Sequence, residues 1–262
     1  MIPTTADAVG ASVAVAARLG IEHDPVVVAE GYSVRVRVGP VLTRVVTTGR
    51  VLRGEPRPWM ERELEVSRFL AASGAPVAAP WPSAGPFVAS GLEVSLWEWL
   101  EPAPGSLPSF GAMLFELHEA LAGYGGELPV LVGPLTDIAT ALRVSDDAVL
   151  HLAAEHLVPL ALTWHRRPLH GDAHTGNVML TAGGPRWIDL EDACVGPVEW
   201  DLASRTLGAD VVAAYPGAID LDRLEQCRDL RALQILAALL TDDVQDKTLY
   251  DEITTRLRQR LS

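Results

Sequence analysis

One stretch of the chain carries three polar side chains whose spacing suits phosphate chemistry. It reads L-H-G-D-A-H-T-G-N from Leu169 to Asn177, and an I-D pair follows at 188–189. Asn177 lies five residues after Asp172, and Asp189 lies 17 residues after it. In phosphoryl transfer one carboxylate orients the attacking hydroxyl, while an amide oxygen and a second carboxylate hold Mg²⁺ against the nucleotide phosphates. The three residues supply one group for each task.

A short hairpin is expected to follow this loop. Residues 177–180 and 186–189 flank the turn sequence T-A-G-G-P, which is typical of a tight connection between two strands. Pairing of these two segments would return Asp189 to the loop that carries Asp172 and Asn177. The sequence therefore predicts that the three groups act together.

The combined pattern resembles a known family. H-G-D-x-H-x-x-N, then I-D-x-E-D, then G-P-x-E-W-D-L-A at 196–203 are similar to the aminoglycoside phosphotransferase and choline kinase-like family, relatives of the protein kinases. The resemblance covers most of the chain and includes the F-x-L-H helix that ends near His118. It implies that Asp172 is the catalytic base and that Asn177 and Asp189 are Mg²⁺ ligands. It also implies that Asp201 accepts hydrogen bonds from the backbone of the catalytic loop.

The nucleotide side departs from the kinase pattern. A kinase places a lysine from its third strand over the phosphates and pairs it with a glutamate on the next helix, but the only lysine here is Lys247. We expect Arg44 to replace that lysine and Glu63 to be its partner, with Arg53 and Glu61 as second choices. Arginine presents a planar fork instead of a point charge. A kinase-fold protein that binds nucleotide or metabolite without turnover therefore stays open as the alternative.

Other nucleotide contacts are expected at two places in the N-terminal part. There is no G-x-G-x-x-G; instead E-G-Y-S at 30–33 opens a strand pair, where Gly31 and Ser33 would approach the phosphates unless they form an ordinary hairpin turn. The resemblance further implies that the carbonyl of Glu98 and the amide of Leu100 meet the adenine edge. A plain buried strand is the alternative for this segment.

Three histidines suggest a metal site as an alternative function of this segment. His165, His170 and His174 lie close in sequence, and a zinc hydrolase brings its histidines to one metal. Their spacing matches none of the common zinc motifs. We therefore expect His170 to pack and shape the loop, and His174 to make local hydrogen bonds.

The remaining pattern predicts a bilobal α+β chain, with a small lobe built on a sheet followed by a larger, mainly helical lobe, and the resemblance implies that the fold is protein-kinase-like. Alternating valines in 26–53 indicate an antiparallel sheet, interrupted by a helix at 59–72 and resumed by a strand at 92–100. The E-P-A-P-G break at 101–105 then separates an N-terminal nucleotide-binding lobe, 1–100, from a catalytic and acceptor-binding lobe, 101–262. Helices are expected at 109–123, 145–165, 220–241 and 244–261.

Charge and cysteine content limit the partners and the compartment. The 262 residues sum to a formal charge of −13, which disfavours nucleic acid and anionic membranes as partners. If the acidic side chains near 191–199 and 242–246 line the acceptor site, they would attract a cationic substrate; a solvated acidic face is the alternative. Two cysteines without a motif suit the cytoplasm.

The expected activity follows from these points together. We expect an ATP-dependent, Mg²⁺-requiring kinase that transfers the γ-phosphoryl group to a hydroxyl of a small molecule. The acceptor would be an aminoglycoside or another antibiotic, as in antibiotic resistance, or an amino sugar or amino alcohol.

Overall fold

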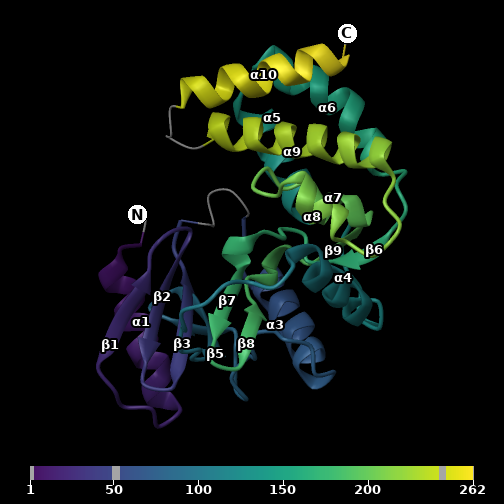
Figure 1. The fold of residues 1–262 in the computed structure, drawn as a ribbon. Coiled ribbons are helices and arrows are strands. Elements are labelled where there is room, and N and C mark those ends of the chain that lie inside the picture. The colour runs from purple at the N-terminus through teal and green to yellow at the C-terminus, as the bar shows by residue number, and fades with distance from the viewer. Residues whose placement is uncertain (1–2, 49–53, 242–245, 262) are drawn as a thin grey trace. The chain divides into compact units, whose positions relative to one another are not determined.

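The computed structural model describes residues 3–48, 54–241 and 246–261. The chain divides into two compact units. Figure 1 shows its helices and strands, with a colour that follows the residue number. The first unit comprises residues 1–106 and 178–191, and the second comprises 107–177 and 192–262. Arg53, Asp242 and Asp243 lie outside the described residues. Among the helices of the described ranges, none has both the length and the apolar character needed to cross a bilayer.

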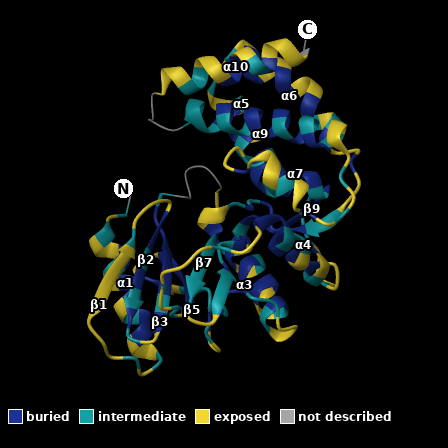
Figure 2. Ribbon diagram, viewed as in Figure 1, coloured by how far each residue is buried: buried dark blue, intermediate teal, exposed yellow. Residues whose placement is uncertain are grey.

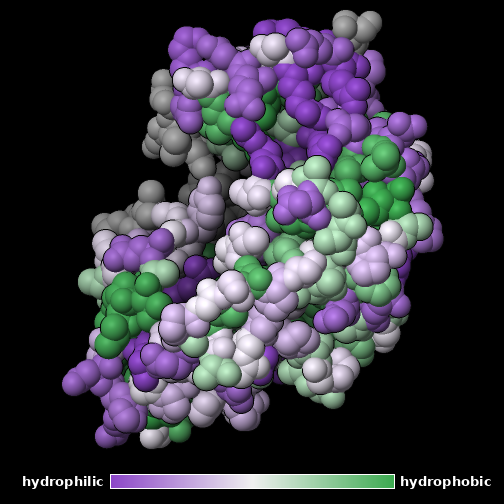
Figure 3. Space-filling model, in the orientation of Figure 1, coloured by the Kyte–Doolittle hydropathy of each residue, from purple (hydrophilic) through white to green (hydrophobic). Residues whose placement is uncertain are grey.

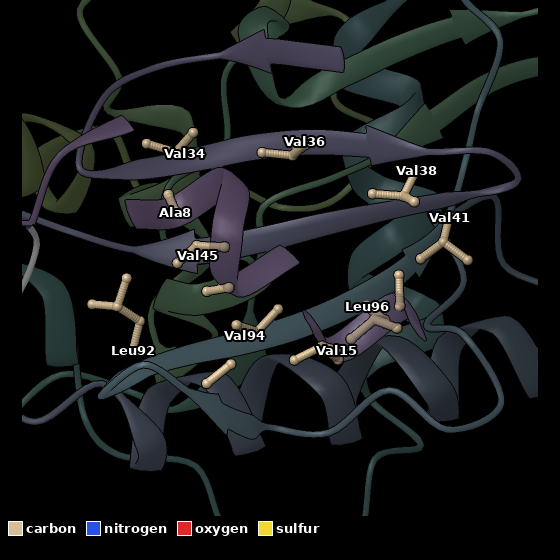
Figure 4. Close-up of a cluster of buried hydrophobic side chains, with 13 residues drawn as sticks. Ala8, Val15, Val34, Val36, Val38, Val41, Val45, Leu92, Val94 and Leu96 are labelled. Atoms are coloured by element: carbon tan, nitrogen blue, oxygen red, sulfur yellow. The ribbon is translucent and has the colours of Figure 1, made fainter. Parts of the chain in front are cut away.

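The first unit is built on a five-stranded antiparallel sheet in the order β1-β2-β3-β5-β4. Its strands are β1 (Pro25–Ala29), β2 (Ser33–Val38), β3 (Val41–Val46), β4 (Phe87–Ala89) and β5 (Leu92–Glu98). Successive side chains of a strand point to opposite faces, so the valines of β2 share one face and its arginines the other. The valine face packs against helix α1 (Thr5–Arg18), as the side chains of Val34, Val36 and Ala8 in Figure 4 show. The sheet and the alternation predicted for this region are confirmed.

The other helix of this unit is α3 (Arg57–Ala72), which confirms the helix expected at 59–72. The buried side of this helix is mostly hydrophobic and includes Trp59, Met60 and Leu64. Glu63 lies on that same side with 2% of its surface exposed. A buried carboxylate costs free energy unless a cation or hydrogen bonds compensate it, so the position of Glu63 already requires a partner.

A hairpin from the middle of the chain completes the first unit. It consists of β7 (Val178–Thr181) and β8 (Gly184–Trp187), paired antiparallel with Val178 opposite Trp187. Backbone hydrogen bonds, all at 2.8 Å, join it to the rest of the unit: the amides of Ala78 and Ala103 donate to the carbonyls of Trp187 and Leu180, and the amide of Trp187 donates to the carbonyl of Pro76. The predicted hairpin is confirmed, and these bonds tie Asp189 to the first unit.

The second unit is mainly helical. Its helices are α4 (Phe110–Leu121), α5 (Val132–Val144), α6 (Ala148–Ala161), α7 (Val198–Leu202), α8 (Ala209–Ala213), α9 (Leu221–Thr241) and α10 (Lys247–Leu261). Helix α9 packs against α5, α6, α7 and α10, so it forms the centre of this unit, and Figure 2 shows its alternation of buried and exposed positions. Strands β6 (Arg167–Leu169) and β9 (Cys194–Gly196) pair antiparallel, and the loop at 170–177 follows β6.

The four helices predicted for this unit are confirmed, but α5 was not predicted. Gly133 and Pro134 lie in its first turn, where they resemble a loop sequence. Proline is tolerated there because the first amides of a helix have no partner within the helix. The residue before α5, Leu131, has φ of +39° and caps nothing with its side chain. No start signal is therefore present in the sequence.

The hydropathy of the surface differs between parts of the chain. Strand β1 lies at the edge of the sheet and exposes Val26, Val27 and Val28. Figure 3 shows a hydrophobic area over this strand and a hydrophilic surface over α10. The strand edge contributes nothing to the polar clusters described next.

Candidate active site

The loop from His170 to Asn177 in the second unit is fixed by a tight turn at its start. Gly171 has φ of +89°, and a Cβ there would lie 1.9 Å from the carbonyl oxygen of Asp192. Only glycine fits both the backbone angle and the space. The G of the H-G-D pattern is thus a packing requirement.

A buried carboxylate from α7 anchors this turn. Asp201 is fully buried and accepts hydrogen bonds from the amides of His170 and Gly171, both at 2.9 Å. Its Oδ2 also lies 3.0 Å from His118 Nε2, and His118 Nδ1 lies 2.9 Å from the hydroxyl of Tyr215. We call these five residues the Asp201 cluster. The expectation that Asp201 accepts hydrogen bonds from the loop backbone is confirmed.

The electrostatics of the Asp201 cluster keep its carboxylate ionised. Burial raises the pKa of Asp201, but the hydrogen bond from His118 and the nearby His170 and Arg231 lower it below its usual value. Because an ionised carboxylate only accepts, His118 donates to Asp201 from Nε2. One carboxylate therefore accepts hydrogen bonds from three residues, His118, His170 and Gly171.

Asp172 follows this turn, and its side chain is 40% exposed. Its Oδ1 lies 3.3 Å from Nη1 of Arg231, and its Oδ2 lies 3.6 Å from Nε2 of His174. Burial raises the pKa of Asp172, but His174 and Arg231 lower it more, so that it lies at about 2. The side chain is consequently an ionised acceptor at neutral pH.

Arg231 of α9 was not singled out by sequence reasoning. It is 8% exposed, its guanidinium carbon lies 3.8 Å from the centre of the Trp200 ring, and its Nη2 donates to the carbonyl of Gly171 at 3.4 Å. Trp200 Nε1 donates to the same carbonyl at 2.7 Å. The signal in the sequence is an arginine at helical spacing from the apolar residues Leu224 and Cys227, both of which are buried.

Asn177 ends the loop in a single 3₁₀ turn, Thr175–Asn177. Its Nδ2 donates to the carbonyl of Asp172 at 2.9 Å, so the loop ties its own two ends together. The amide nitrogen is used, and Oδ1 is the atom left to coordinate a cation. Nearby, His170 is buried and its Nδ1 accepts from the Asp172 amide, while His174 Nδ1 accepts from Gly176. Both histidines thus have local structural roles, as expected.

The first unit holds a second polar group, which we call the Arg44 cluster. It consists of two arginines and three carboxylates: Arg35, Arg44, Glu63, Asp189 and Glu191. Nη1 of Arg44 donates to both oxygens of Glu63, at 2.8 and 2.9 Å. The pairing of Arg44 with Glu63 is therefore confirmed; Glu61 instead pairs with Arg57 on the outer side of α3.

All three guanidinium nitrogens of Arg44 face protein acceptors. Nε donates to the hydroxyl of Ser33 at 3.1 Å, and Nη2 donates to the carboxylate of Glu191. Burial opposes the charge, but Glu191, Glu63 and Asp189 raise the pKa of Arg44 above its already high value. Burial also raises the pKa of Glu63 against the effect of Arg44, and Asp189 and Glu191 raise it further. Both side chains of the pair are almost fully buried.

Asp189 lies just after β8 in a left-handed backbone conformation, with φ of +65°. Its Oδ2 accepts from Nη2 of Arg35 at 2.8 Å, and its Oδ1 lies 3.0 Å from Nη1 of Arg44. A non-glycine residue in this region is strained by about 1–2 kcal/mol. The two arginines hold the carboxylate against that strain.

The other predicted nucleotide contacts lie in the first unit. Gly31 is in the β1–β2 turn, where a Cβ would meet open space, and Ser33 is buried at the start of β2. Glu98 ends β5 and is exposed, and Leu100 follows it and is partly buried. Their nucleotide contacts stay predictions.

The acidic residues expected near the acceptor contact different parts of the protein. Glu191 binds Arg44, Asp192 is buried, and Glu199 is buried and accepts from the amide of Asp220. Asp246 caps α10 by accepting from the amide of Leu249. These contacts are structural, and the attraction of a cationic acceptor stays a prediction.

The proposed metal ligands have the chemistry that Mg²⁺ requires. Mg²⁺ binds oxygen ligands, mostly carboxylates, together with water and phosphate oxygens. Asp189 supplies a carboxylate with lone pairs beyond those that face the arginines, and Asn177 supplies an amide oxygen. Within the described residues, no three histidine, cysteine, aspartate or glutamate side chains gather as a metal site.

Comparison with known proteins shows which family the chain belongs to. The family model described as the phosphotransferase enzyme family matches residues 28–236. The chain belongs to the phosphotransferase enzyme family. The match covers strands β2 to β5 of the first unit, the loop with Asp172 and most of α9, so both polar clusters lie within it.

Curated proteins that resemble the chain match it over limited parts of their sequence. A methylthioribose kinase of Cronobacter sakazakii is 29% identical over 143 residues, 53% of this chain and 33% of that enzyme. A methylthioribose kinase of Exiguobacterium sibiricum is 35% identical over 109 residues, 42% of this chain and 26% of that enzyme. The matched stretches thus span about a third or less of these relatives.

Solved structures show the fold over almost the whole chain. Amicoumacin kinase hAmiN has a TM-score of 0.69 at 14% identity, with 95% of this chain and 92% of that chain covered. Choline kinase LicA from Streptococcus pneumoniae has a TM-score of 0.67 at 14% identity, covering 95% and 96%. Aminoglycoside phosphotransferase APH(4)-Ia has a TM-score of 0.66 at 17% identity, covering 98% of each chain. The predicted α+β, protein-kinase-like fold is confirmed.

Proposed function

We propose that this member of the phosphotransferase enzyme family is an ATP-dependent kinase that phosphorylates a hydroxyl group of a small molecule. The observation that carries the proposal is the ionised Asp172 carboxylate, held beside Arg231 on a loop that Asp201 anchors. A kinase needs such a fixed, negatively charged acceptor for the hydroxyl proton. The Arg44–Glu63 pair supports the same conclusion, because it corresponds to the cation–glutamate pair of kinases.

Asp172 orients the acceptor in this proposal. The acceptor oxygen forms a bond to the γ-phosphorus, the bond to the β-phosphate oxygen of ATP breaks, and ADP leaves. The hydroxyl proton passes to Asp172. With a pKa of about 2, this carboxylate is a weak base, so the proton moves only after the new oxygen–phosphorus bond has made the hydroxyl acidic. Its main contribution is alignment of the nucleophile.

Asp189 and Asn177 are the residues that would hold Mg²⁺, which neutralises phosphate charge when bound. Glu98 and Leu100 would offer the adenine a backbone carbonyl and a backbone amide. Gly31 and Ser33 would lie near the phosphates. These roles rest on the family resemblance and on the oxygen ligands of Asp189 and Asn177.

The acceptor class is wider than the sequence alone suggested. Aminoglycosides, other antibiotics, amino sugars and amino alcohols stay candidates, and the names of the matched relatives add methylthioribose. All of them carry a free hydroxyl. The acidic composition of the chain favours acceptors that carry a positive charge.

A second function is favoured by one observation. Because all three nitrogens of Arg44 face protein groups, this arginine has no free nitrogen for a phosphate. A protein with the kinase fold that binds nucleotide or metabolite without turnover is the alternative. The two functions differ in whether ATP is consumed.

Mg²⁺-dependent ATP consumption by the purified protein tests the proposal. We would add a library of hydroxylated amines, antibiotics and thio-sugars, follow ADP, and identify the phosphorylated product by mass spectrometry. The matched control is Asp172→Asn, which keeps the size of the side chain and removes its charge. Stimulated ADP release by the wild type alone supports the kinase. Nucleotide binding without ADP release for any acceptor supports the binding protein.

A further inference from the structure

Arg44 is poorly placed to bind nucleotide phosphates. Its side chain is 7% exposed, and its nitrogens contact Ser33, Glu63 and Glu191. A phosphate could reach this guanidinium only by displacing one of the carboxylates. Removing the partner of a buried charge is costly because the charge is then uncompensated in a poorly solvated site.

Arg35 is the second arginine of the same cluster, and its surroundings differ. It lies on β2 directly opposite Arg44 of β3 in the antiparallel register, so the two side chains share one face of the sheet. Its side chain is 31% exposed. Within the described part of the chain it makes one ion pair, from Nη2 to Asp189 Oδ2 at 2.8 Å.

The charge of the cluster also points to Arg35. Asp189 faces both arginines of the cluster, Arg35 through Oδ2 and Arg44 through Oδ1. A cation that binds Asp189 would weaken the hold of this carboxylate on its arginines. The partly exposed pair with Arg35 is the one that separates at little cost, because exposed ion pairs contribute little and water solvates the freed charge.

We propose that Arg35 of β2, and not Arg44 of β3, is the cation that binds the β- and γ-phosphates of the nucleotide. This inference rests on the proposed function. Arg44 stays buried as the support that holds Glu63, Glu191 and Asp189 in place. Arg35 exchanges Asp189 for phosphate oxygens when the nucleotide and its Mg²⁺ bind, and its planar fork can then meet two phosphate oxygens at once.

Calorimetry with Mg²⁺ and two nucleotides tests the assignment. AMP-PNP carries the β- and γ-phosphates, and AMP lacks both. We would titrate each into the wild type, Arg35→Gln, Arg35→Lys and the control Arg57→Gln. Arg57 is a partly exposed arginine of the same unit, and among the described residues its one carboxylate partner is Glu61, so its loss makes the same change in net charge.

Arg35→Gln is expected to weaken AMP-PNP binding by about tenfold or more, the effect of one charge-assisted phosphate contact, and to leave AMP binding unchanged. Arg35→Lys should recover part of the affinity, since a point charge still attracts phosphate. Arg57→Gln should match the wild type. The thermal unfolding temperature without ligand should be nearly the same for all four proteins, because the Arg35 pair is partly exposed.

Three outcomes would overturn the assignment. In the first, Arg35→Gln binds AMP-PNP as tightly as the wild type. In the second, it weakens AMP as much as AMP-PNP, which would indicate a general change of the unit. In the third, Arg35→Lys is no better than Arg35→Gln. A wild type that binds neither nucleotide would refute the proposed function itself, whereas a wild type that binds both and a variant that behaves like it would refute only this inference.

Discussion

The Arg44 cluster and the Asp201 cluster each contain a buried charged side chain, but different kinds of group compensate the two charges. Arg44 is compensated by side chains, namely the carboxylates of Glu63, Asp189 and Glu191. Asp201 is compensated largely by backbone amides, those of His170 and Gly171, and by a hydrogen bond from His118. Backbone donors cannot move without moving the chain, while side chains can change partners. The Asp201 cluster is therefore suited to hold a loop, and the Arg44 cluster is suited to exchange ions.

The largest effect is expected for a change at Asp172, which should affect turnover but not nucleotide binding. Asp172→Asn should lower kcat by about 10²–10⁴, the range for a positioned acid–base group, because the amide cannot take the hydroxyl proton. The affinity for AMP-PNP should change little, since Asp172 holds no phosphate in the proposal. Steady-state kinetics and calorimetry check the two parts. Turnover close to the wild type would remove Asp172 from the reaction.

The next effect concerns the stability of the Arg44 cluster. Arg44→Met leaves three carboxylates near one another without their central cation, and it should cost about 3–5 kcal/mol of unfolding free energy, as for other broken buried pairs. The double variant Arg44→Met, Glu63→Met should recover much of this loss, because it removes the buried charge as well. Urea unfolding measures both. If the single variant costs less than about 1 kcal/mol, the pair is solvated and the description of the cluster is wrong.

A smaller effect is expected for the Asp201 cluster. Asp201→Asn keeps one oxygen acceptor but turns an amide nitrogen towards a backbone donor or His118, so it should cost about 1–3 kcal/mol, the penalty of one unsatisfied buried group. Hydrogen exchange should show faster exchange at the amides of His170 and Gly171, which Asp201 now binds. Unchanged exchange at both amides would contradict the anchoring role. Tyr215→Phe is a milder control, because it removes only the outer hydroxyl of the chain of hydrogen bonds.

The smallest effect is a pH dependence outside both clusters. Asp147 caps α6 by accepting from the amides of Val149 and Leu150, and it accepts from the hydroxyl of Tyr250 at 2.5 Å. Burial raises the pKa of Asp147, but these hydrogen bonds lower it below its usual value. Its folded-state pKa is lower than its unfolded one, so its contribution to stability is present above the unfolded value of about 3.9 and is lost as the pH falls through the folded value.

Asp147→Asn tests this sign, because asparagine also caps helices but does not titrate. The variant should be less stable than the wild type by less than about 1 kcal/mol at pH 7, and the difference should shrink as the pH falls below about 4. Urea unfolding at several pH values gives the curve. A difference that grows towards low pH would contradict the direction of the shift.

The candidate site could be proposed from the sequence because its signals are local. The spacing of Asp172, Asn177 and Asp189 and the turn between β7 and β8 lie within one continuous segment, where residue type decides the backbone. The pairing of Arg44 with Glu63 followed from the family pattern. Arg231 and α5 were missed for opposite reasons: an arginine inside an apolar helix face gives no role by itself, and α5 lacks a capping residue at its start.

By itself the sequence determined the elements and the chemistry that they carry: a valine-rich antiparallel sheet, the helices around it, and a loop with an acidic residue and an amide at kinase spacing. It predicted the pair of Arg44 with Glu63 but not the other charges that join it. The register of β2 and β3 places Arg35 beside Arg44, and the hairpin adds Asp189 to both arginines, although Asp189 is more than a hundred positions away in the sequence. Such contacts depend on burial and distance in the folded chain, and these exist only once the tertiary structure has formed.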